Sequence, residues 1–418
     1  MTQPLLDVVD LHTHFPVRGG LFSRRSDVVR AVDGVTFDIA PGEVFGLVGE
    51  SGSGKTTLGR TLLKLVDPTS GSIIYRGRDL APLREREMRP LRRELALVSQ
   101  DPNASLNPAM TVAQGVGHPL MIHGLASSRT QMRDRVGEML ERVGLTPGER
   151  FLDVYPEDLS GGQKQRLVIA RALITEPSFV VADEPVAALD MSVRARVLEL
   201  MLDLQRDLGL TYLFITHDLA TARFLCDRIG ILYLGNLVEW GDADTLFGDP
   251  QHPYTRALLD AIPLPDPGRR ERDKDLPVGE MPDAQEPPSG CRFHPRCPAA
   301  FEPCGWTGDD LIGFFERRWT EVDTDAVRAE VEATGGLDDA AVRDGGIRFD
   351  AGDAPALVRL LEDLRARQAH PLFTAVEAIE RDGDHVEVSF GPGPEPALQR
   401  VAGREVACHL HGITTRER

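Results

Sequence analysis

Residues 49–56 of the 418-residue chain, GESGSGKT, restrict the possible folds more than any other stretch, because they match the pattern GxxxxGK[ST]. The apolar segment EVFGLV precedes them, and the helical pattern KTTLGRTLLKL begins within them. In a strand–loop–helix unit of this kind, backbone N–H groups and the positive end of the helix surround a phosphate. The sequence therefore predicts a nucleotide phosphate site made by Gly49, Ser51, Gly52, Ser53, Gly54, Lys55, Thr56 and Thr57.

Two residues of this loop and two acidic residues further on predict the chemistry of the site. Lys55 would bring a positive charge to the β- and γ-phosphates, and the Thr56 hydroxyl would ligate Mg²⁺. In the apolar stretch FVVADE, Asp183 would complete the Mg²⁺ shell and Glu184 would orient and activate the attacking water. These residues do not separate kinases, GTPases, helicases and transport ATPases.

The hydrophobic pattern of the first 262 residues predicts an α/β domain with a parallel sheet. Helical patterns alternate with further apolar strands, as in parallel sheets, and the strands are expected at 95–99, 179–183 and 211–216. Residues 5–45 alternate apolar and polar positions, as half-buried antiparallel strands do. The stretch 102–178 is mainly helical, and RIGILYLGNLVEW predicts a closing hairpin with Gly235-Asn236 at its turn.

Two segments of different composition come after this domain. Residues 263–290 are rich in proline, glycine and charge and predict a linker. Residues 307–398 carry about twice as many acidic as basic side chains. Their leucines 357, 360, 361 and 364 share one helical face, and TAVEAIERDGDHVEVSF predicts two strands around an Asp-Gly turn. We therefore favour a small folded α+β insertion over a solvated acidic tail.

Charge and hydropathy exclude several classes of protein. The formal charge of -18 argues against binding nucleic acid through bulk electrostatics. The chain has no stretch of about 18 apolar residues that would predict a membrane span, and its beginning does not resemble a signal peptide. We expect an intracellular protein with reduced thiols. A closed metal site usually has four ligands, and three cysteines lie close together in the sequence: Cys291, Cys297 and Cys304. They are either three of four ligands of a metal site or no site at all.

The stretch LSGGQKQR, which includes Ser160, Gly161, Gly162 and Gln163, resembles the ATP-binding-cassette family. The resemblance implies a P-loop NTPase fold with a parallel core sheet, an antiparallel β subdomain and a helical subdomain. It also implies that LSGGQ contacts the γ-phosphate of a nucleotide held by a second cassette. Further matches to the family are Gln100 as the glutamine-loop residue, Asp190 in the D-loop and His217 as the switch histidine, with Phe15 as the candidate for stacking on adenine.

Other stretches are similar to the ATP-binding subunits of oligopeptide and dipeptide importers, namely QDPNASLNP, YLGNLVEWG, HPYTRALL and GEMPDAQEPPSGCRFHPRCP. This resemblance implies ATP-driven closure of two cassettes against two membrane permease subunits at the cytoplasmic face, with an extracellular substrate-binding protein. It implies a homologous second cassette and peptides as substrates. Nickel and oligosaccharides remain alternatives, as does a soluble cassette protein outside transport.

The importer resemblance also bears on the cysteines. A VACH segment in that subfamily completes a four-cysteine set, which here adds Cys408 to Cys291, Cys297 and Cys304. The family pattern implies a 4Fe–4S cluster. A Zn²⁺ site and the absence of any metal remain alternatives to the cluster. His294 or His409 could then substitute for a cysteine ligand. We expect residues 291–306 and 399–418 to form this region, the acidic insertion to lie between its third and fourth ligands, and Cys226 to be a core residue.

Overall fold

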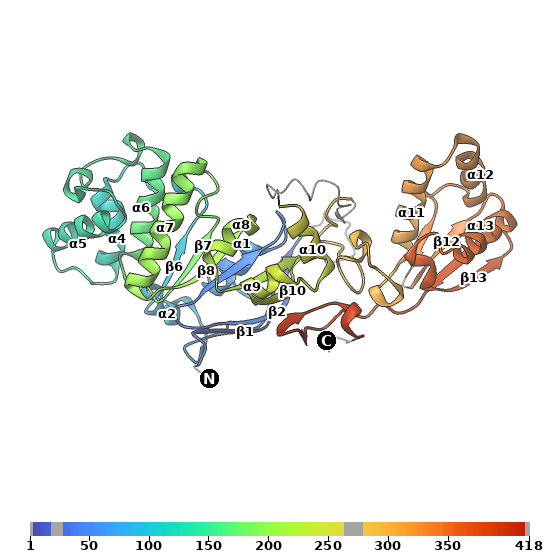
Figure 1. Ribbon diagram of the computed structural model, residues 1–418, viewed down its shortest axis with the longest axis horizontal. Coiled ribbons are helices and arrows are strands. Elements are labelled where there is room, and N and C mark those ends of the chain that lie inside the picture. The colour runs from blue at the N-terminus through green and yellow to red at the C-terminus, as the bar shows by residue number, and fades with distance from the viewer. Residues whose placement is uncertain (1–2, 18–27, 263–278, 344, 414–418) are drawn as a thin grey trace. The chain divides into compact units, whose positions relative to one another are not determined.

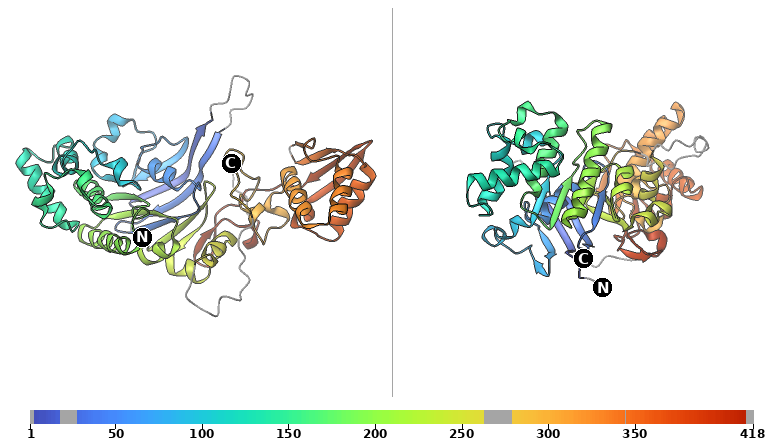
Figure 2. Two further views of the ribbon diagram at one scale, coloured as in Figure 1. Left: turned by 90° about the horizontal axis from the view of Figure 1, so that it is seen from above. Right: turned by 60° about the vertical axis from the view of Figure 1, so that its left-hand side comes forward.

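The structure is a computed structural model that describes residues 3–17, 28–262, 279–343 and 345–413. It contains two compact units, Met1–Asp249 and Pro250–Arg418. Figure 1 labels their helices and strands, and Figure 2 gives two further views. No helix in the described ranges is both long and apolar enough to cross a membrane.

The first unit contains a mainly parallel sheet of apolar strands. Within this unit the strands run in the order β10-β9-β3-β8-β7-β6, and only β10 is antiparallel to its neighbour. Every residue of β3, β7 and β8 is buried, which explains their uninterrupted apolar sequences. The bounds are β3 Val44–Val48, β6 Leu95–Val98, β7 Phe179–Asp183, β8 Thr211–Thr216, β9 Arg228–Tyr233 and β10 Asn236–Asp242.

An antiparallel sheet accompanies it, in the order β2-β1-β4-β5. Alternation puts Leu6 and Val8 into a core shared with Phe45 of β3 and Leu58 of α1. An irregularity of β1 between Val8 and Leu11 brings Leu11 into the same core. The bounds are β1 Leu6–Pro16, β2 Val28–Ile39, β4 Ser70–Tyr75 and β5 Arg78–Asp79. The α/β fold with an antiparallel part is therefore confirmed.

Helices alternate with the strands of the first unit, and the region 102–178 is mainly helical, as expected. Figures 1 and 2 show α4 and α5 grouped at one edge of this unit. Side-chain N-caps such as Thr111, Ser128 and Ser160 start α4, α5 and α6. The bounds are α1 Lys55–Leu62, α2 Glu85–Met88, α3 Pro102–Ser105, α4 Val112–Ile122, α5 Arg129–Arg142, α6 Gly161–Leu173, α7 Met191–Leu208, α8 Leu219–Leu225 and α9 Ala243–Gly248.

The predicted turn of the closing hairpin is wrong by one residue. Tyr233 pairs with Asn236, so the turn residues are Leu234 and Gly235 and not Gly235-Asn236. Both have positive φ, 45° and 82°, which is the backbone of a type I′ turn. A leucine rarely adopts positive φ, so the sequence pattern favoured the adjacent Gly-Asn pair as the turn.

The second unit contains a separate α+β core. A four-stranded sheet has the order β11-β12-β14-β13, and α11 and α13 pack against it. Leu357, Leu361 and Leu364 are buried, whereas Leu360 is half-buried at the edge of the same face. The bounds are α10 Pro253–Asp260, α11 Gly308–Glu321, α12 Thr324–Thr334, β11 Ala341–Arg343, β12 Gly346–Asp350, α13 Ala354–Ala366, β13 Val376–Asp382, β14 His385–Phe390, β15 Gln399–Val401 and β16 Arg404–Val406.

The chain leaves and re-enters the cysteine segment at one point, which we call the glycine junction and define as Gly290, Gly305 and Gly393. A Cβ built on Gly393 would overlap the Cα of Gly305, and one built on Gly305 would lie 2.8 Å from the Cα of Gly290. The two ends of the acidic block therefore lie against each other. Of the expected linker, residues 263–278 lie outside the described residues, and residues 279–290 contain no helix or strand.

Candidate nucleotide site

The glycine-rich loop connects β3 to α1, and its backbone is packed too closely for side chains at two positions. A Cβ on Gly49 would overlap the carbonyl oxygen of Leu232, and a Cβ on Gly54 would overlap that of Ala31. Gly54 also has φ +102°, a conformation that favours glycine. The glycines of the motif are thus required by the neighbouring backbone as well as by the turn.

Lys55 points back into this loop. Its Nζ donates to the carbonyl oxygens of Gly49, at 2.8 Å, and Glu50, at 2.7 Å. Burial lowers the pKa of the Lys55 ammonium, while the nearby carboxylates of Glu184 and Asp183 raise it. The ammonium is therefore held inside the turn of the loop. From this position it can donate hydrogen bonds to the oxygens of a bound phosphate.

Thr56 and Asp183 offer adjacent oxygen ligands for a hard cation. The Thr56 hydroxyl donates to Asp183 Oδ1 at 3.0 Å, and Asp183 ends the buried strand β7. Burial raises the pKa of Asp183, and the Thr56 hydrogen bond only partly opposes this shift. A buried carboxylate beside a hydroxyl fits Mg²⁺, because a divalent cation would stabilise the ionised form.

Glu184 lies between Gln100 and His217, at the ends of three neighbouring strands. Gln100 Nε2 donates to Glu184 Oε2 at 3.1 Å, and His217 Nδ1 lies 3.1 Å from Glu184 Oε1. The parallel strands β6, β7 and β8 bring these residues together, since their carboxyl ends meet at one edge of the sheet. Glu184 has φ 45°, a strained backbone for a non-glycine residue and one that is found at functional sites.

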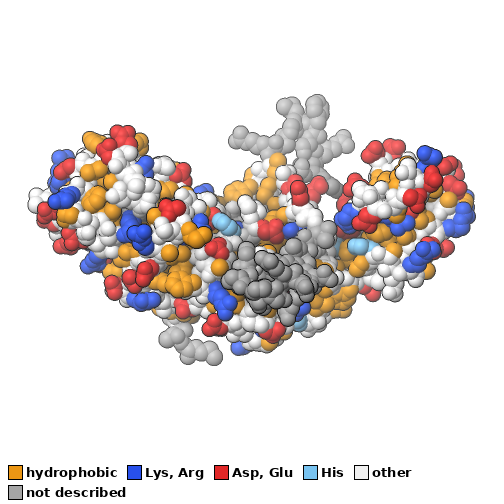
Figure 3. Space-filling view, turned by 45° about the horizontal axis from the view of Figure 1, so that its top comes forward, with side chains coloured by type: hydrophobic (Ala, Val, Ile, Leu, Met, Phe, Trp, Pro, Cys, Tyr) orange, Lys and Arg blue, Asp and Glu red, His pale blue; other side chains and the backbone are white. Residues whose placement is uncertain are grey.

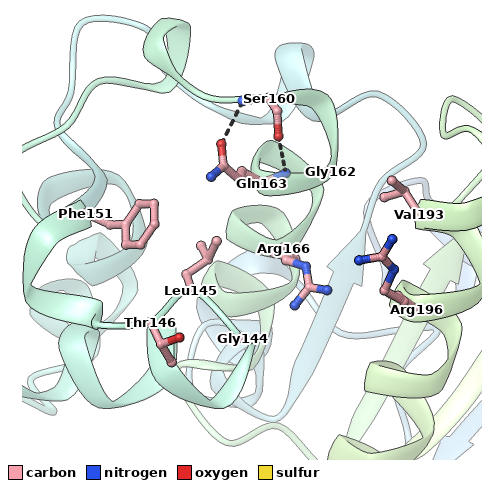
Figure 4. Close-up of a pocket in the computed structure, with 10 residues that line it drawn as sticks. All are labelled: Gly144, Leu145, Thr146, Phe151, Ser160, Gly162, Gln163, Arg166, Val193 and Arg196. Carbon is pink, nitrogen blue, oxygen red and sulfur yellow. Dashed lines mark hydrogen bonds between the residues drawn. The ribbon is translucent and has the colours of Figure 1, made fainter.

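The LSGGQ residues lead into α6, and Ser160, Gly162 and Gln163 among them line a cavity of about 350 Å³ (Figure 4). The Ser160 side chain accepts from Gln163 N at 3.3 Å, and the Gln163 side chain accepts from Ser160 N at 2.9 Å, which forms a capping box. Arg166 and Arg196 also line the cavity, and sequence reasoning did not single out either residue. None of residues 49–57 lines this cavity.

Two further predicted residues lie outside the cluster around Glu184. Asp190 caps α7, where its carboxylate accepts from Val193 N at 3.0 Å and Ser192 Oγ at 2.9 Å. These hydrogen bonds lower the pKa of Asp190. Phe15 is 39% exposed on β1, so its ring is available to a ligand from solvent.

Comparison with known proteins agrees with this geometry. The family model for "ABC transporter" matches residues 32–187, and the model for "Oligopeptide/dipeptide transporter, C-terminal region" matches residues 238–304. AppF of Bacillus subtilis, an oligopeptide transport ATP-binding protein, is 44% identical over 72% of this chain and 92% of its own length. YkfD of the same organism, whose name as an oligopeptide transport ATP-binding protein is provisional, is 50% identical over 72% of this chain and 90% of its own length.

The chain belongs to the ABC transporter family. Among solved structures, the dimeric post-hydrolysis state of the ATP-binding cassette MJ0796 with ADP and Pi is similar, with TM-score 0.51 and 30% identity over 57% of this chain and 98% of that chain. cbiO1 from Clostridium perfringens, part of the ABC transporter complex cbiONQ, also has TM-score 0.51, at 28% identity over 59% of this chain and 92% of its own. The first unit is thus an ATP-hydrolysing ABC cassette.

The match to the oligopeptide/dipeptide transporter C-terminal region ends at Cys304, within the cysteine segment. Cys291 N donates to the carbonyl oxygen of Cys304 at 2.9 Å, so the segment folds back on itself. Burial raises the pKa of the Cys291 thiol, and the neighbouring thiols of Cys304, Cys408 and Cys297 raise it further. Burial and two of these neighbours raise the pKa of Cys297 to about 12. The structure therefore places Cys291 near the other three predicted cysteines.

Both histidines that were considered as substitute ligands have other partners. His294 Nδ1 hydrogen-bonds the carbonyl oxygen of Cys291 at 2.9 Å, and its Nε2 lies 3.2 Å from Asp310. His409 Nε2 hydrogen-bonds the carbonyl oxygen of Pro394 at 2.9 Å. Cys226 is buried in the ABC cassette, with its sulfur against Gly46, as a core residue would be. The five cysteines, all of which lie in described residues, form no disulfide bond.

Proposed function

We propose that this chain is the ATP-hydrolysing subunit of a membrane importer that takes up di- or oligopeptides. The observation that carries the proposal is the position of Glu184, whose carboxylate lies between Gln100 and His217 and beside the phosphate loop. A carboxylate in this position can orient a water and take its proton. The names of AppF and YkfD as oligopeptide transport proteins support the peptide class of substrate.

The residues of the site have separate roles in this proposal. Residues 49–57 bind the phosphates, Lys55 neutralises their charge, and Thr56, Asp183 and Gln100 would hold Mg²⁺, which supplies charge stabilisation when bound. Glu184 acts on the attacking water, and Gln100 and His217 fix the orientation of its carboxylate. Phe15 stacks on the adenine ring.

The LSGGQ residues act on a nucleotide bound by a second cassette. The cavity that they line contains no residue of the phosphate loop, which supports action between subunits rather than within one chain. Asp190, at the start of α7, communicates across the same interface. The second cassette is a homologous but different chain, and both cassettes bind two permease subunits at the cytoplasmic face of the membrane, with a substrate-binding protein outside.

The four cysteines hold a 4Fe–4S cluster with a structural role. Burial raises the pKa of the thiols of Cys291, Cys297 and Cys304, and Cys408 lies near the first two. This supports a thiolate-binding metal group, because such a group stabilises thiolates that burial otherwise disfavours. Zinc is the alternative. An anaerobic preparation with the visible absorption of an iron–sulfur cluster and about four irons per chain supports the cluster, and a colourless protein with one zinc contradicts it.

A second function as a nucleic-acid-binding cassette has no support in the charge distribution. The formal charge is -18, and Figure 3 shows acidic and basic side chains interspersed over the face that it presents. Nucleic-acid binding would require clustered basic side chains.

The experiment that tests the proposal is reconstitution of this chain with its permease and partner cassette in vesicles. We expect ATP-dependent uptake of labelled di- or oligopeptides when the cognate binding protein is added. ATP-dependent uptake of nickel or oligosaccharide instead would overturn the peptide assignment. Failure of the chain to co-purify with any permease would overturn the importer assignment.

A further inference from the structure

Two histidines and one aspartate form a cluster on the antiparallel sheet, and the nucleotide chemistry does not use them. His12 and His14 lie two residues apart on β1, so their side chains share one face of the strand. Thr13 between them points to the other face, where its hydroxyl lies 3.1 Å from that of Thr61 in α1. Asp33 of β2 is paired directly with His12 across the two strands.

The three side chains converge on one point. His12 Nδ1 lies 2.8 Å and His14 Nε2 lies 2.9 Å from the same oxygen, Oδ1 of Asp33. One ligand atom from each residue lies within 4.8 Å of the other two. Zn²⁺ binds imidazole nitrogen and carboxylate oxygen at about 2.0–2.2 Å, so neighbouring ligand atoms on one ion are roughly 3 Å apart. The two distances to Asp33 Oδ1 agree with this requirement, and one nitrogen of each histidine lies within 4.8 Å of the other.

The carboxylate of Asp10 adds a second negative charge beside the histidines. Asp10 Oδ1 lies 3.2 Å from His12 Nε2, behind the ring, which is the arrangement that fixes the tautomer of a metal-binding histidine and increases its basicity. Arg30 brings an opposing positive charge, which lies beside the other oxygen of Asp33, at 3.8 Å from Oδ2. The side chains of both histidines are 22% exposed and that of Asp33 is 10% exposed, so an ion can enter from solvent and keep water as a remaining ligand.

We propose that His12, His14 and Asp33 bind a divalent transition-metal ion of the Zn²⁺ type. Two imidazoles and one carboxylate are the donor set that such ions prefer, and carboxylate-rich or all-oxygen sites suit Mg²⁺ and Ca²⁺ instead. The site does not depend on the proposed substrate, and it lies in the first unit, whereas the four cysteines lie in the second.

The position of the site gives the ion a structural consequence. It would join β1 to β2 one residue before Phe15. Asp33 N donates to the carbonyl oxygen of Gly235 at 2.9 Å, and Gly235 N donates to that of Ser53 at 2.9 Å, so two backbone hydrogen bonds connect the site to the phosphate loop. The ion would thus fix the strand that borders the nucleotide.

The test is titration of the full chain with Zn²⁺ by calorimetry, together with X-ray absorption at the zinc edge. We expect one ion whose ligands are nitrogen and oxygen only, which separates it from any zinc on the cysteines. His12→Asn and His14→Asn each remove this ion, with affinity reduced at least about 100-fold. Asp10→Asn, which changes only the group behind His12, reduces affinity about tenfold.

His118→Asn, at an exposed histidine of α4, is the matched control and leaves affinity unchanged. Thermal unfolding in EDTA verifies that each variant folds like the wild type. If one of the two histidine variants does not fold like the wild type, the zinc affinity of the other variant tests the proposal. An absent nitrogen–oxygen-ligated ion in the wild type, or equal affinity in His14→Asn, would mean that the three residues form a hydrogen-bonded cluster only and would overturn the proposal.

Discussion

The nucleotide site and the cysteine site are assembled in different ways. Gln100, Glu184 and His217 each lie just beyond the end of a strand, and the parallel order of β6, β7 and β8 alone makes them neighbours. Cys304 and Cys408, in contrast, are separated by a folded block with its own core. The segments that carry them come close to each other because that block begins and ends at the glycine junction. The geometry of the nucleotide site thus depends on the order of strands in the sheet. The geometry of the cysteine region depends on the two ends of the inserted block lying close together.

The largest expected effect is at Glu184. Glu184→Gln keeps the shape of the side chain but removes the group that takes a proton, so the rate of ATP hydrolysis should fall about 10²–10⁴-fold while ATP still binds. Phosphate release by the complex with its partner and permease measures the rate. Glu199→Gln, at an exposed glutamate of α7, should leave it unchanged. Wild-type hydrolysis in Glu184→Gln would contradict the assignment.

The separation of the two cores is tested by Leu361, which is fully buried in the second unit. Leu361→Ala should lower the free energy of unfolding of that unit by about 2–5 kcal/mol through the cavity that it creates. Leu360→Ala, one residue earlier and only half-buried, should cost less. Denaturant unfolding measures both. We expect nucleotide affinity to stay the same, and a parallel loss of affinity would show that the two sites are not assembled independently.

The glycine junction provides a sharper comparison between two glycines with similar backbones. Gly305 has φ +104° and is crowded by Ser289 and Gly290, whereas Gly403 has φ +85° and open space around its Cα. Gly305→Ala should cost the left-handed strain and the overlap together, roughly 2–4 kcal/mol, and lower the content of the metal that we propose for the cysteines. Gly403→Ala should cost only about 1 kcal/mol. Equal metal content and equal unfolding midpoints in the two variants would argue against the junction.

The smallest effect concerns pH. Burial lowers the pKa of His252 to about 3, so this residue stays neutral in the folded second unit while the unfolded chain takes up a proton near pH 6.5. The free energy of unfolding should therefore fall as pH decreases below 6.5, by up to about 1.4 kcal/mol per pH unit from this group. His252→Asn keeps a side chain that can cap α10 and should reduce that slope. Unfolding curves at pH 7 and 5.5 measure the difference, and an unchanged slope in the variant would contradict it.

Sequence reasoning identified the nucleotide residues because each belongs to a short contiguous pattern next to an apolar strand. Asp183 and Glu184, for example, lie at the end of a strand in which every residue is buried, and the motif specifies their surroundings. The Leu234 turn was missed because a leucine rarely adopts positive φ. The cluster of His12, His14 and Asp33 was missed because it depends on the pairing of β1 with β2, which contains bulges near all three residues. The His-x-His spacing on an alternating strand was the available signal.

The close approach of Gly305 and Gly393 also affects how the chain can evolve by insertion of a domain. A segment whose entry and exit coincide does not displace the chain beyond it, so β15, β16 and Cys408 keep their places whether a folded block or a short link joins the two glycines. The whole α+β block could have been gained in one genetic step without repacking its host. The same position would accept another domain with adjacent termini, such as a fluorescent reporter.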